Sequence, residues 1–213
     1  MPNGVNMTID AERDAKRREF FDACAKGWED RNYPPELKQQ VGEMLSGLEF
    51  SQGMTILDVG CGQGVLLPFL RRLIGENGRL IALDASASML EGVAERDAKA
   101  LAVCAPAEKI PLIDRYVDMV ICFSAFPHFS DKAAAAMEFF RVLKPGGKAY
   151  VLHIGSRETI NRHHGMHEAV ESDHLPCEHS MREIFSKAGF SSIELDEEQA
   201  HYYFSALKKR SKC

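Results

Sequence analysis

The chain has 213 residues, of which 45% are hydrophobic and 27% charged; this composition fits one soluble globular domain and excludes a mainly disordered or fibrous protein. A formal net charge of -5 argues against nucleic acid as the main partner, because a phosphate backbone requires a basic binding face. No apolar run approaches the ~18 residues that span a bilayer. The six cysteines are scattered without a C-x-x-C pair, so we expect a cytoplasmic protein with no membrane span.

Two helices are predicted before residue 50. Residues 10–30 place Phe20 and Trp28 on one apolar face behind a polar one, and Tyr33-Pro34-Pro35 then breaks the pattern. A second helix is expected over 35–48.

From Met54 onward, short apolar runs alternate with helical stretches. Because ILDV and VDMVICF are continuously apolar, their strands are expected to be buried on both faces, which is typical of a parallel sheet covered by helices. Right-handed crossovers then give a doubly wound α/β fold. The predicted strands lie near 54–59, 79–84, 101–105, 117–123 and 147–154, and the helices between them near 64–74, 86–98 and 131–143.

The last third of the chain has a different pattern. A polar, histidine-rich stretch over 156–179 precedes a helix at 179–188 that Gly189 closes. Two alternating segments follow, Ser191–Asp196 and His201–Lys208, and we expect them to pair as an antiparallel hairpin.

A glycine-rich turn is the most informative segment. In ILDVGCGQGVLLPFL, residues 56–70, Gly60, Gly62 and Gly64 follow a buried strand and let the backbone approach a ligand closely. Asp58 lies in that strand, and Asp84 ends the next strand about 20 residues beyond the turn, where an acid can bind both ribose hydroxyls. These features alone suit any nucleotide cofactor, including NAD in an oxidoreductase, or a simple tight connection.

Five segments in order carry a family resemblance. They are DVGCGQG, LDASxxML, AEKIPL, YVDMVICF and FFRVLKPGG, and residues 18–155 that contain them resemble class I S-adenosylmethionine-dependent methyltransferases, particularly the ubiquinone and menaquinone biosynthesis branch. The resemblance implies a Rossmann-like, mostly parallel seven-stranded sheet. It divides a single domain, residues 1–213, into lid helices (10–48), a cofactor core (54–155), a histidine-rich acceptor cap (156–190) and a hairpin (191–208).

The resemblance also implies roles for single residues, with S-adenosylmethionine as cofactor and S-adenosylhomocysteine as product. Phe20 and Trp28 are expected to close over the cofactor or simply to anchor the first helix. Pro106 stands where relatives usually carry an acid for the adenine amine. The expected contacts are Asp58, Gly60, Cys61 and Gly62 with the methionine part, Asp84 with the ribose, Ala85 and Met89 along the nucleoside, Ala107 and Glu108 at the adenine, and Ser124 near the sulfonium.

The transfer is expected to be an in-line displacement of methyl onto a small molecule, with the protein supplying mainly orientation. If the acceptor is a hydroxyl, His128 in SAFPHFSD is the candidate base, because it follows the fourth predicted strand. His128 could equally cap or pack the next helix.

The acceptor is expected to meet the segment 153–179, which holds six of the eight histidines. We predict that His153, Asn161, His164 and His174 point toward the acceptor; a solvated, mobile cap is the alternative. His163 and His167 have the spacing of ligands on a helix, but no zinc signature is complete, so no metal is predicted. A protein that senses S-adenosylmethionine without turnover remains a second alternative.

Overall fold

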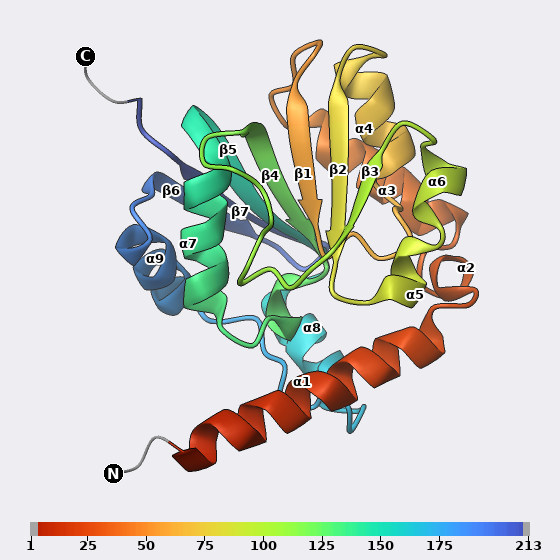
Figure 1. The fold of residues 1–213 in the computed structure, drawn as a ribbon, viewed down its shortest axis with the longest axis vertical. Coiled ribbons are helices and arrows are strands. Elements are labelled where there is room, and N and C mark those ends of the chain that lie inside the picture. Colours follow the sequence, from red (N-terminus) through yellow and green to blue (C-terminus); the bar gives the residue numbers. More distant parts are fainter. Residues whose placement is uncertain (1–3, 211–213) are drawn as a thin grey trace.

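The computed structural model describes residues 4–210, with side chains from residue 12 onward, so the ends of the predicted 1–213 domain lie outside the described residues. Seven strands form one sheet in the order β3-β2-β1-β4-β5-β7-β6 (Figure 1). The strands β1 to β5 run parallel, and β7 is antiparallel to both β5 and β6. They are β1 (Thr55–Val59), β2 (Arg79–Asp84), β3 (Leu101–Cys104), β4 (Val117–Phe123), β5 (Leu143–Ile154), β6 (Ser191–Glu197) and β7 (His201–Leu207). The predicted fold class is confirmed.

Helices cover both faces of the sheet. They are α1 (Gly4–Cys24), α2 (Trp28–Asn32), α3 (Pro35–Ser46), α4 (Leu67–Ile74), α5 (Ala87–Leu90), α6 (Val93–Arg96), α7 (Lys132–Val142), α8 (Arg157–His164) and α9 (Glu178–Lys187), with a 3-10 turn η1 (Phe126–His128) after β4.

The core has two halves because successive residues of a buried strand face opposite sides. Ile56 of β1 packs with Leu45 of α3 and Leu70 of α4 on one face. Leu57 packs on the other face in the cluster that contains Phe139 of α7 and Phe185 of α9. All five residues of β1 are buried, including Thr55 and Asp58, as expected for a strand of a parallel sheet covered on both faces.

Two predicted helices are interrupted. The helix expected over 10–30 ends at Cys24, and a second one starts at Trp28, because Gly27 adopts a left-handed conformation with φ 69°. The helix expected over 86–98 is two single turns, α5 and α6. Gly92 lies between them against the glycine-rich turn, where an added Cβ would lie 3.1 Å from the carbonyl oxygen of Gln63.

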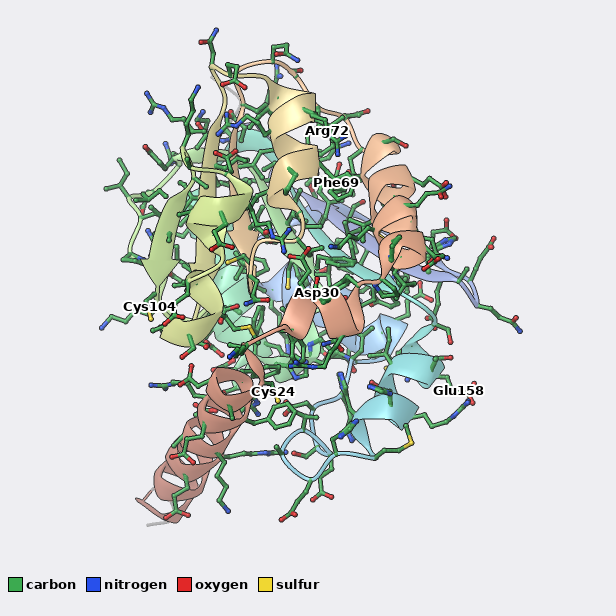
Figure 2. The ribbon with its side chains drawn as sticks, turned by 90° about the vertical axis from the view of Figure 1, so that its right-hand side faces the viewer. Cys24, Asp30, Phe69, Arg72, Cys104 and Glu158 are labelled. Carbon is green, nitrogen blue, oxygen red and sulfur yellow. The ribbon has the colours of Figure 1, made fainter. Side chains whose placement is uncertain are left out.

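Helix α1 lies across the carboxyl ends of the parallel strands, and α8 lies at the same edge of the sheet (Figure 1 and Figure 2). In open α/β sheets, ligands bind at this edge. Within residues 4–210, no helix is both long and apolar enough to cross a membrane.

Candidate active site

The turn after β1 is a bare backbone surface at the carboxyl edge of the sheet. Gly60, Gly62 and Gly64 have φ values of 72°, 53° and 86°, which side chains rarely adopt. A Cβ on Gly60 would lie 2.2 Å from the Cβ of Ala125. The Gly60 N–H donates to the Leu83 carbonyl oxygen at 2.7 Å, which ties the turn to β2.

Two carboxylates lie beside this turn, at the ends of adjacent parallel strands. The oxygens of Asp84 accept hydrogen bonds from the N–H groups of Gly62 and Ser86, both at 2.9 Å. Asp58 is 2% exposed, and its Oδ2 has no hydrogen-bond partner among the described residues. Burial, reinforced by the charge of Asp84, raises the pKa of Asp58 to about 8. A buried, unpartnered carboxyl is costly, so this position favours a ligand that brings a cation or a donor.

Both carboxylates line a cavity of about 1180 Å³, including space open to solvent. Ser124 lines it at the end of β4 with a φ of 55°, a strained conformation for a residue with a side chain. With the exception of Gly64, the cofactor-binding residues predicted from the sequence all line the cavity: Asp58, Gly60, Cys61, Gly62, Asp84, Ala85, Met89, Ala107, Glu108 and Ser124.

Gly64 lies just behind the cavity, where a Cβ would lie 2.7 Å from Leu67. It therefore shapes the turn from the helix side rather than facing the ligand.

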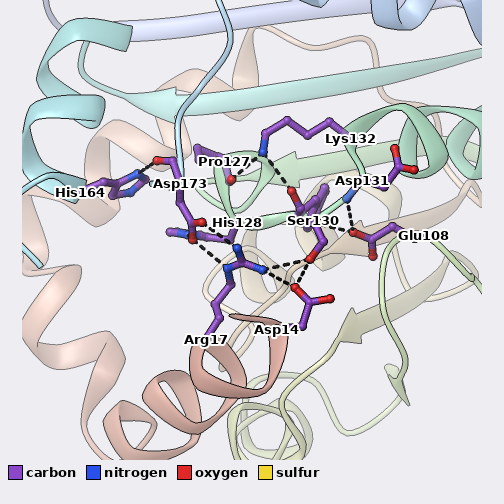
Figure 3. A network of polar contacts seen from close by, with 11 residues as sticks. Asp14, Arg17, Glu108, Pro127, His128, Ser130, Asp131, Lys132, His164 and Asp173 are labelled. Carbon is purple, nitrogen blue, oxygen red and sulfur yellow. Dashed lines mark hydrogen bonds and ion pairs between the residues drawn. The ribbon is translucent and has the colours of Figure 1, made fainter. Parts of the chain in front are cut away.

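The part of the cavity predicted to face the nucleoside is lined by Met89, Pro106, Ala107 and Glu108. Met89 is 2% exposed and Ala107 is 4% exposed. The Glu108 carboxylate accepts the N–H groups of Ser130 at 2.9 Å and Asp131 at 3.2 Å (Figure 3). Glu108 thus holds the loop after β4 beside the predicted adenine position, where the side chain of Pro106 offers no hydrogen-bond acceptor.

The aromatic residue that α1 contributes to the cavity lies one position beyond the predicted one. Phe21, and not Phe20, lines the cavity together with Trp28. The Phe21 ring contacts Trp28 at 5.7 Å and His128 at 5.0 Å between ring centroids, both edge to face, whereas Phe20 packs against Phe21 at 5.3 Å. The side chains of consecutive helical residues point about 100° apart, so Phe20 lies behind its neighbour.

His128, the predicted base, lines the cavity at the end of η1. Its Nδ1 lies 2.8 Å from Oδ2 of Asp173 (Figure 3). Arg17 of α1 donates to both oxygens of the same carboxylate, at 2.8 Å each. These contacts join helix α1, the loop after β4 and the histidine-rich segment in one polar network.

The four residues predicted to face the acceptor do not line the cavity. His153 is 3% exposed on β5 and packs against Tyr202, and His174 is exposed. Asn161 exchanges two hydrogen bonds with the backbone of Leu175. His164 Nδ1 lies 2.7 Å from the Asp173 carbonyl oxygen, so it donates there. Asn161 and His164 are used to fold the segment itself, which keeps their polar atoms from the cavity.

Tyr33, Glu29 and Arg17 also line the cavity and were not predicted from the sequence. Burial raises the pKa of Tyr33 to about 12, which keeps its phenol neutral. Glu29 is buried and pairs with Lys38 at 2.7 Å and Arg96 at 2.9 Å. The tyrosine precedes two prolines that read only as a helix break, so its orientation carried no sequence signal. Within the described residues, no three His, Cys, Asp or Glu side chains are grouped closely enough to hold a metal ion.

Comparison with known proteins identifies the type of domain. Residues 57–151 match the family described as "Methyltransferase domain". The chain is 38% identical over 106 residues to a ubiquinone/menaquinone biosynthesis C-methyltransferase of Vibrio cholerae, a match that covers 47% of this chain and 41% of the relative. It is 38% identical over 115 residues to a malonyl-[acyl-carrier protein] O-methyltransferase of Serratia marcescens, with 52% and 43% covered. The matches thus span less than half the length of these relatives.

Solved structures share the whole fold. A S-adenosylmethionine-dependent methyltransferase from Aquifex aeolicus superposes with a TM-score of 0.71 at 22% identity, covering 86% of this chain and 98% of that one. A Haloferax volcanii methyltransferase, solved in complex with a methyltransferase activator, gives 0.74 at 23% identity, covering 89% and 98%. The predicted resemblance to S-adenosylmethionine-dependent methyltransferases is confirmed, and S-adenosylmethionine is the cofactor that these similar proteins imply.

Proposed function

Residues 57–151 form a methyltransferase domain, and on that premise we propose that the chain binds S-adenosylmethionine in the cavity and transfers its methyl group to a small molecule in the cytoplasm. S-adenosylmethionine supplies a methyl group that its sulfonium has already activated. The chain's own residues bind, orient and exclude water.

One observation carries the proposal: Oδ2 of the buried Asp58 has no hydrogen-bond partner among the described residues, and Asp58 lies beside a glycine turn that presents bare backbone. This site fits a ligand with a positive charge next to a nucleoside. Asp58 would face the cationic amino-acid end, while Asp84 would exchange its backbone donors for the ribose hydroxyls. Ser124, at the end of β4, would face the same amino-acid end.

Helix α1 would close the cavity once the cofactor is bound. Ser86 donates to the Asp22 carboxylate of α1, and the Ser130 hydroxyl donates to Asp14 of the same helix. Together with the Arg17 ion pair, these contacts attach the lid to three separate loops at the carboxyl edge of the sheet. A closed lid keeps water from the transferring group and holds the acceptor in line.

Calorimetric titration with S-adenosylmethionine, S-adenosylhomocysteine and NAD tests the binding. We expect both sulfur compounds to bind and NAD not to bind. Asp84→Asn is expected to weaken binding about 10-fold to 100-fold, because a hydrogen bond to a charged group is worth about 1.5–3 kcal/mol. The matched control is Asp196→Asn, since Asp196 is exposed on β6. NAD binding without S-adenosylmethionine binding would contradict the proposal.

Turnover is tested separately. The protein is incubated with methyl-labelled S-adenosylmethionine and a small-molecule cell extract, and the labelled product is identified by mass. A protein that binds both sulfur compounds but labels nothing in any extract would be a sensor rather than an enzyme.

A further inference from the structure

We propose that Asp173 is a positioning residue that holds His128 as the general base for an acceptor whose attacking atom is an aromatic hydroxyl oxygen. This inference rests on the proposed function and identifies the acceptor class for the same site. It assigns Asp173 a role that the sequence did not predict.

The first step is the protonation pattern of the imidazole. His128 Nδ1 lies 2.8 Å from Asp173 Oδ2 (Figure 3). Burial alone raises the pKa of Asp173, yet hydrogen bonds from His128 and Arg17 bring it down to about 2, so the group is a carboxylate. A carboxylate only accepts, so Nδ1 carries the hydrogen. In the neutral ring, Nε2 is then the atom with the free lone pair.

The second step is the fixed orientation of the ring. The Phe21 and His164 rings contact the imidazole of His128 at 5.0 Å and 4.7 Å between centroids. The His128 side chain is 16% exposed and lines the cavity. A base that is held in place by its neighbours loses little entropy when it meets the acceptor.

The third step is the support of Asp173 itself. Its side chain is 3% exposed, and Arg17 binds both of its oxygens. Its backbone carbonyl accepts from His164, and Asn161 holds the backbone of Leu175, two residues on. The folded histidine-rich segment thus places the Asp173 carboxylate beside His128. Asn161 and His164 bind the backbone of this segment, which explains why they do not line the cavity.

The acceptor class follows from the cavity wall and from the need for a base. Phe21, Trp28 and Phe129 line the cavity together with His128, and the Phe21 ring contacts His128 and Trp28; these aromatic walls favour a flat aromatic molecule. A hydroxyl needs a base most, because it loses its proton less readily than a thiol, and a neutral amine already has a free lone pair.

The atoms balance as follows. The acceptor oxygen gives its proton to Nε2 of His128 and forms a bond to the methyl carbon. The bond between that carbon and sulfur breaks, with its electron pair left on sulfur. The imidazolium, stabilised by Asp173, then releases the proton to water.

The test begins with nitrogen NMR of the ¹⁵N-histidine-labelled full chain bound to S-adenosylhomocysteine. We expect His128 to be the Nδ1–H tautomer in the unmodified protein and in Asp173→Glu. In Asp173→Asn we expect a mixture of the two tautomers. Glu171→Gln is the matched control, because Glu171 is an exposed acid two residues away. An Nε2–H tautomer in the unmodified protein would overturn the inference, as would an unchanged tautomer in Asp173→Asn.

The second readout is the probe 4-nitrophenol, whose phenolate absorbs visible light, compared with its methyl ether, 4-nitroanisole. With S-adenosylhomocysteine bound, we expect 4-nitrophenol to bind and to ionise more than in buffer. At S-adenosylhomocysteine concentrations that saturate each variant, His128→Gln is expected to abolish this shift and Asp173→Asn to reduce it at least about threefold. Absence of binding, or an equal shift in His128→Gln, would overturn the aromatic-hydroxyl assignment.

The two proposals fail differently. If the unmodified protein does not bind S-adenosylhomocysteine, the proposed function fails. If it binds that compound but His128 has the wrong tautomer, only the role of Asp173 and the acceptor class fail.

Discussion

Arg17 and Asp173 lie 156 residues apart in the sequence and form a buried ion pair in which Nε–Oδ2 and Nη2–Oδ1 are both 2.8 Å. The pair connects the lid helix α1 to the segment that also contacts His128. The position of the lid and the environment of the predicted base are therefore set by the same carboxylate.

We expect Arg17→Ala to loosen α1 and to lower the free energy of unfolding by about 1–3 kcal/mol, because it leaves a buried carboxylate with fewer donors. Hydrogen exchange of the α1 amides should become faster, and the affinity for S-adenosylhomocysteine should fall. Arg162→Ala is the control, because Arg162 forms an exposed ion pair with Glu158, worth at most about 1 kcal/mol. Equal exchange rates in both variants would show that the pair does not hold the lid.

We expect Asp58 to make cofactor binding depend on pH. Its pKa is about 8 in the ligand-free protein, and a cationic ligand favours the carboxylate, so binding must displace a proton below pH 8. Affinity is expected to weaken by up to about tenfold for each pH unit between 7.5 and 5.5. Calorimetry in buffers of different ionisation enthalpy measures the released proton directly.

The matched variant for this test is Asp58→Asn, in which the pH dependence over that range should flatten and the affinity at pH 7.5 should fall. The same variant should stabilise the ligand-free protein at neutral pH, because it removes a buried carboxyl that must take up a proton when the chain folds. A wild-type affinity that is constant from pH 7.5 to 5.5 would contradict this role of Asp58.

The glycine turn can be tested with two alanine variants that separate backbone strain from lack of space. Gly53 and Gly60 both have positive φ, 81° and 72°, but only Gly60 is crowded, by Ala125 at 2.2 Å from an added Cβ. Gly53→Ala is expected to cost about 1 kcal/mol of stability. Gly60→Ala is expected to cost about 3 kcal/mol or more and to abolish cofactor binding. Urea unfolding of both variants, together with calorimetry, measures this difference.

His153 should make the protein sensitive to acid. Burial, together with nearby His128 and His164, lowers its pKa to about 3 from 6.5, so the unfolded chain binds a proton that the folded chain refuses. Stability from this group is present above pH 6.5 and is lost as pH falls toward 3, with about 2 kcal/mol gone at pH 5.

Urea midpoints at pH 7 and pH 5 check this sign. The difference between the urea midpoint at pH 7 and that at pH 5 should become smaller in His153→Gln. It should persist in His174→Gln, because His174 is exposed. A pH dependence that is identical in both variants would assign the acid sensitivity to other groups.

The parallel sheet could be predicted because its strands are continuous apolar runs, and the cofactor side of the site because the glycine turn and Asp84 are close to their strands in sequence. The helix predicted over residues 10–30 is longer than α1 because Trp28 continues the apolar pattern. The backbone, however, turns at Gly27. Here a single backbone conformation outweighed periodicity.

The acceptor side could not be predicted in the same way. Asp173 lies 45 residues from His128, and no periodic pattern connects a loop residue to a distant histidine. His153, Asn161 and His164 are polar residues that the sequence places near the acceptor, but in the structure His153 packs against Tyr202, and Asn161 and His164 bind backbone carbonyls of the same segment. Phe20 and Phe21 are adjacent in the sequence. Which of the two faces the cavity depends on the rotation of α1 about its axis, and the sequence does not fix that rotation.

The position of β7 between β5 and β6 has a consequence for synthesis. A growing chain that has not yet reached His201 leaves the edge of β5 open and gives β6 no neighbour with which to pair. Tyr202, buried against His153, also arrives only then. An open edge strand is a site for aggregation, so ribosome-bound intermediates that stop before residue 201 are the stage at which this protein most needs a chaperone.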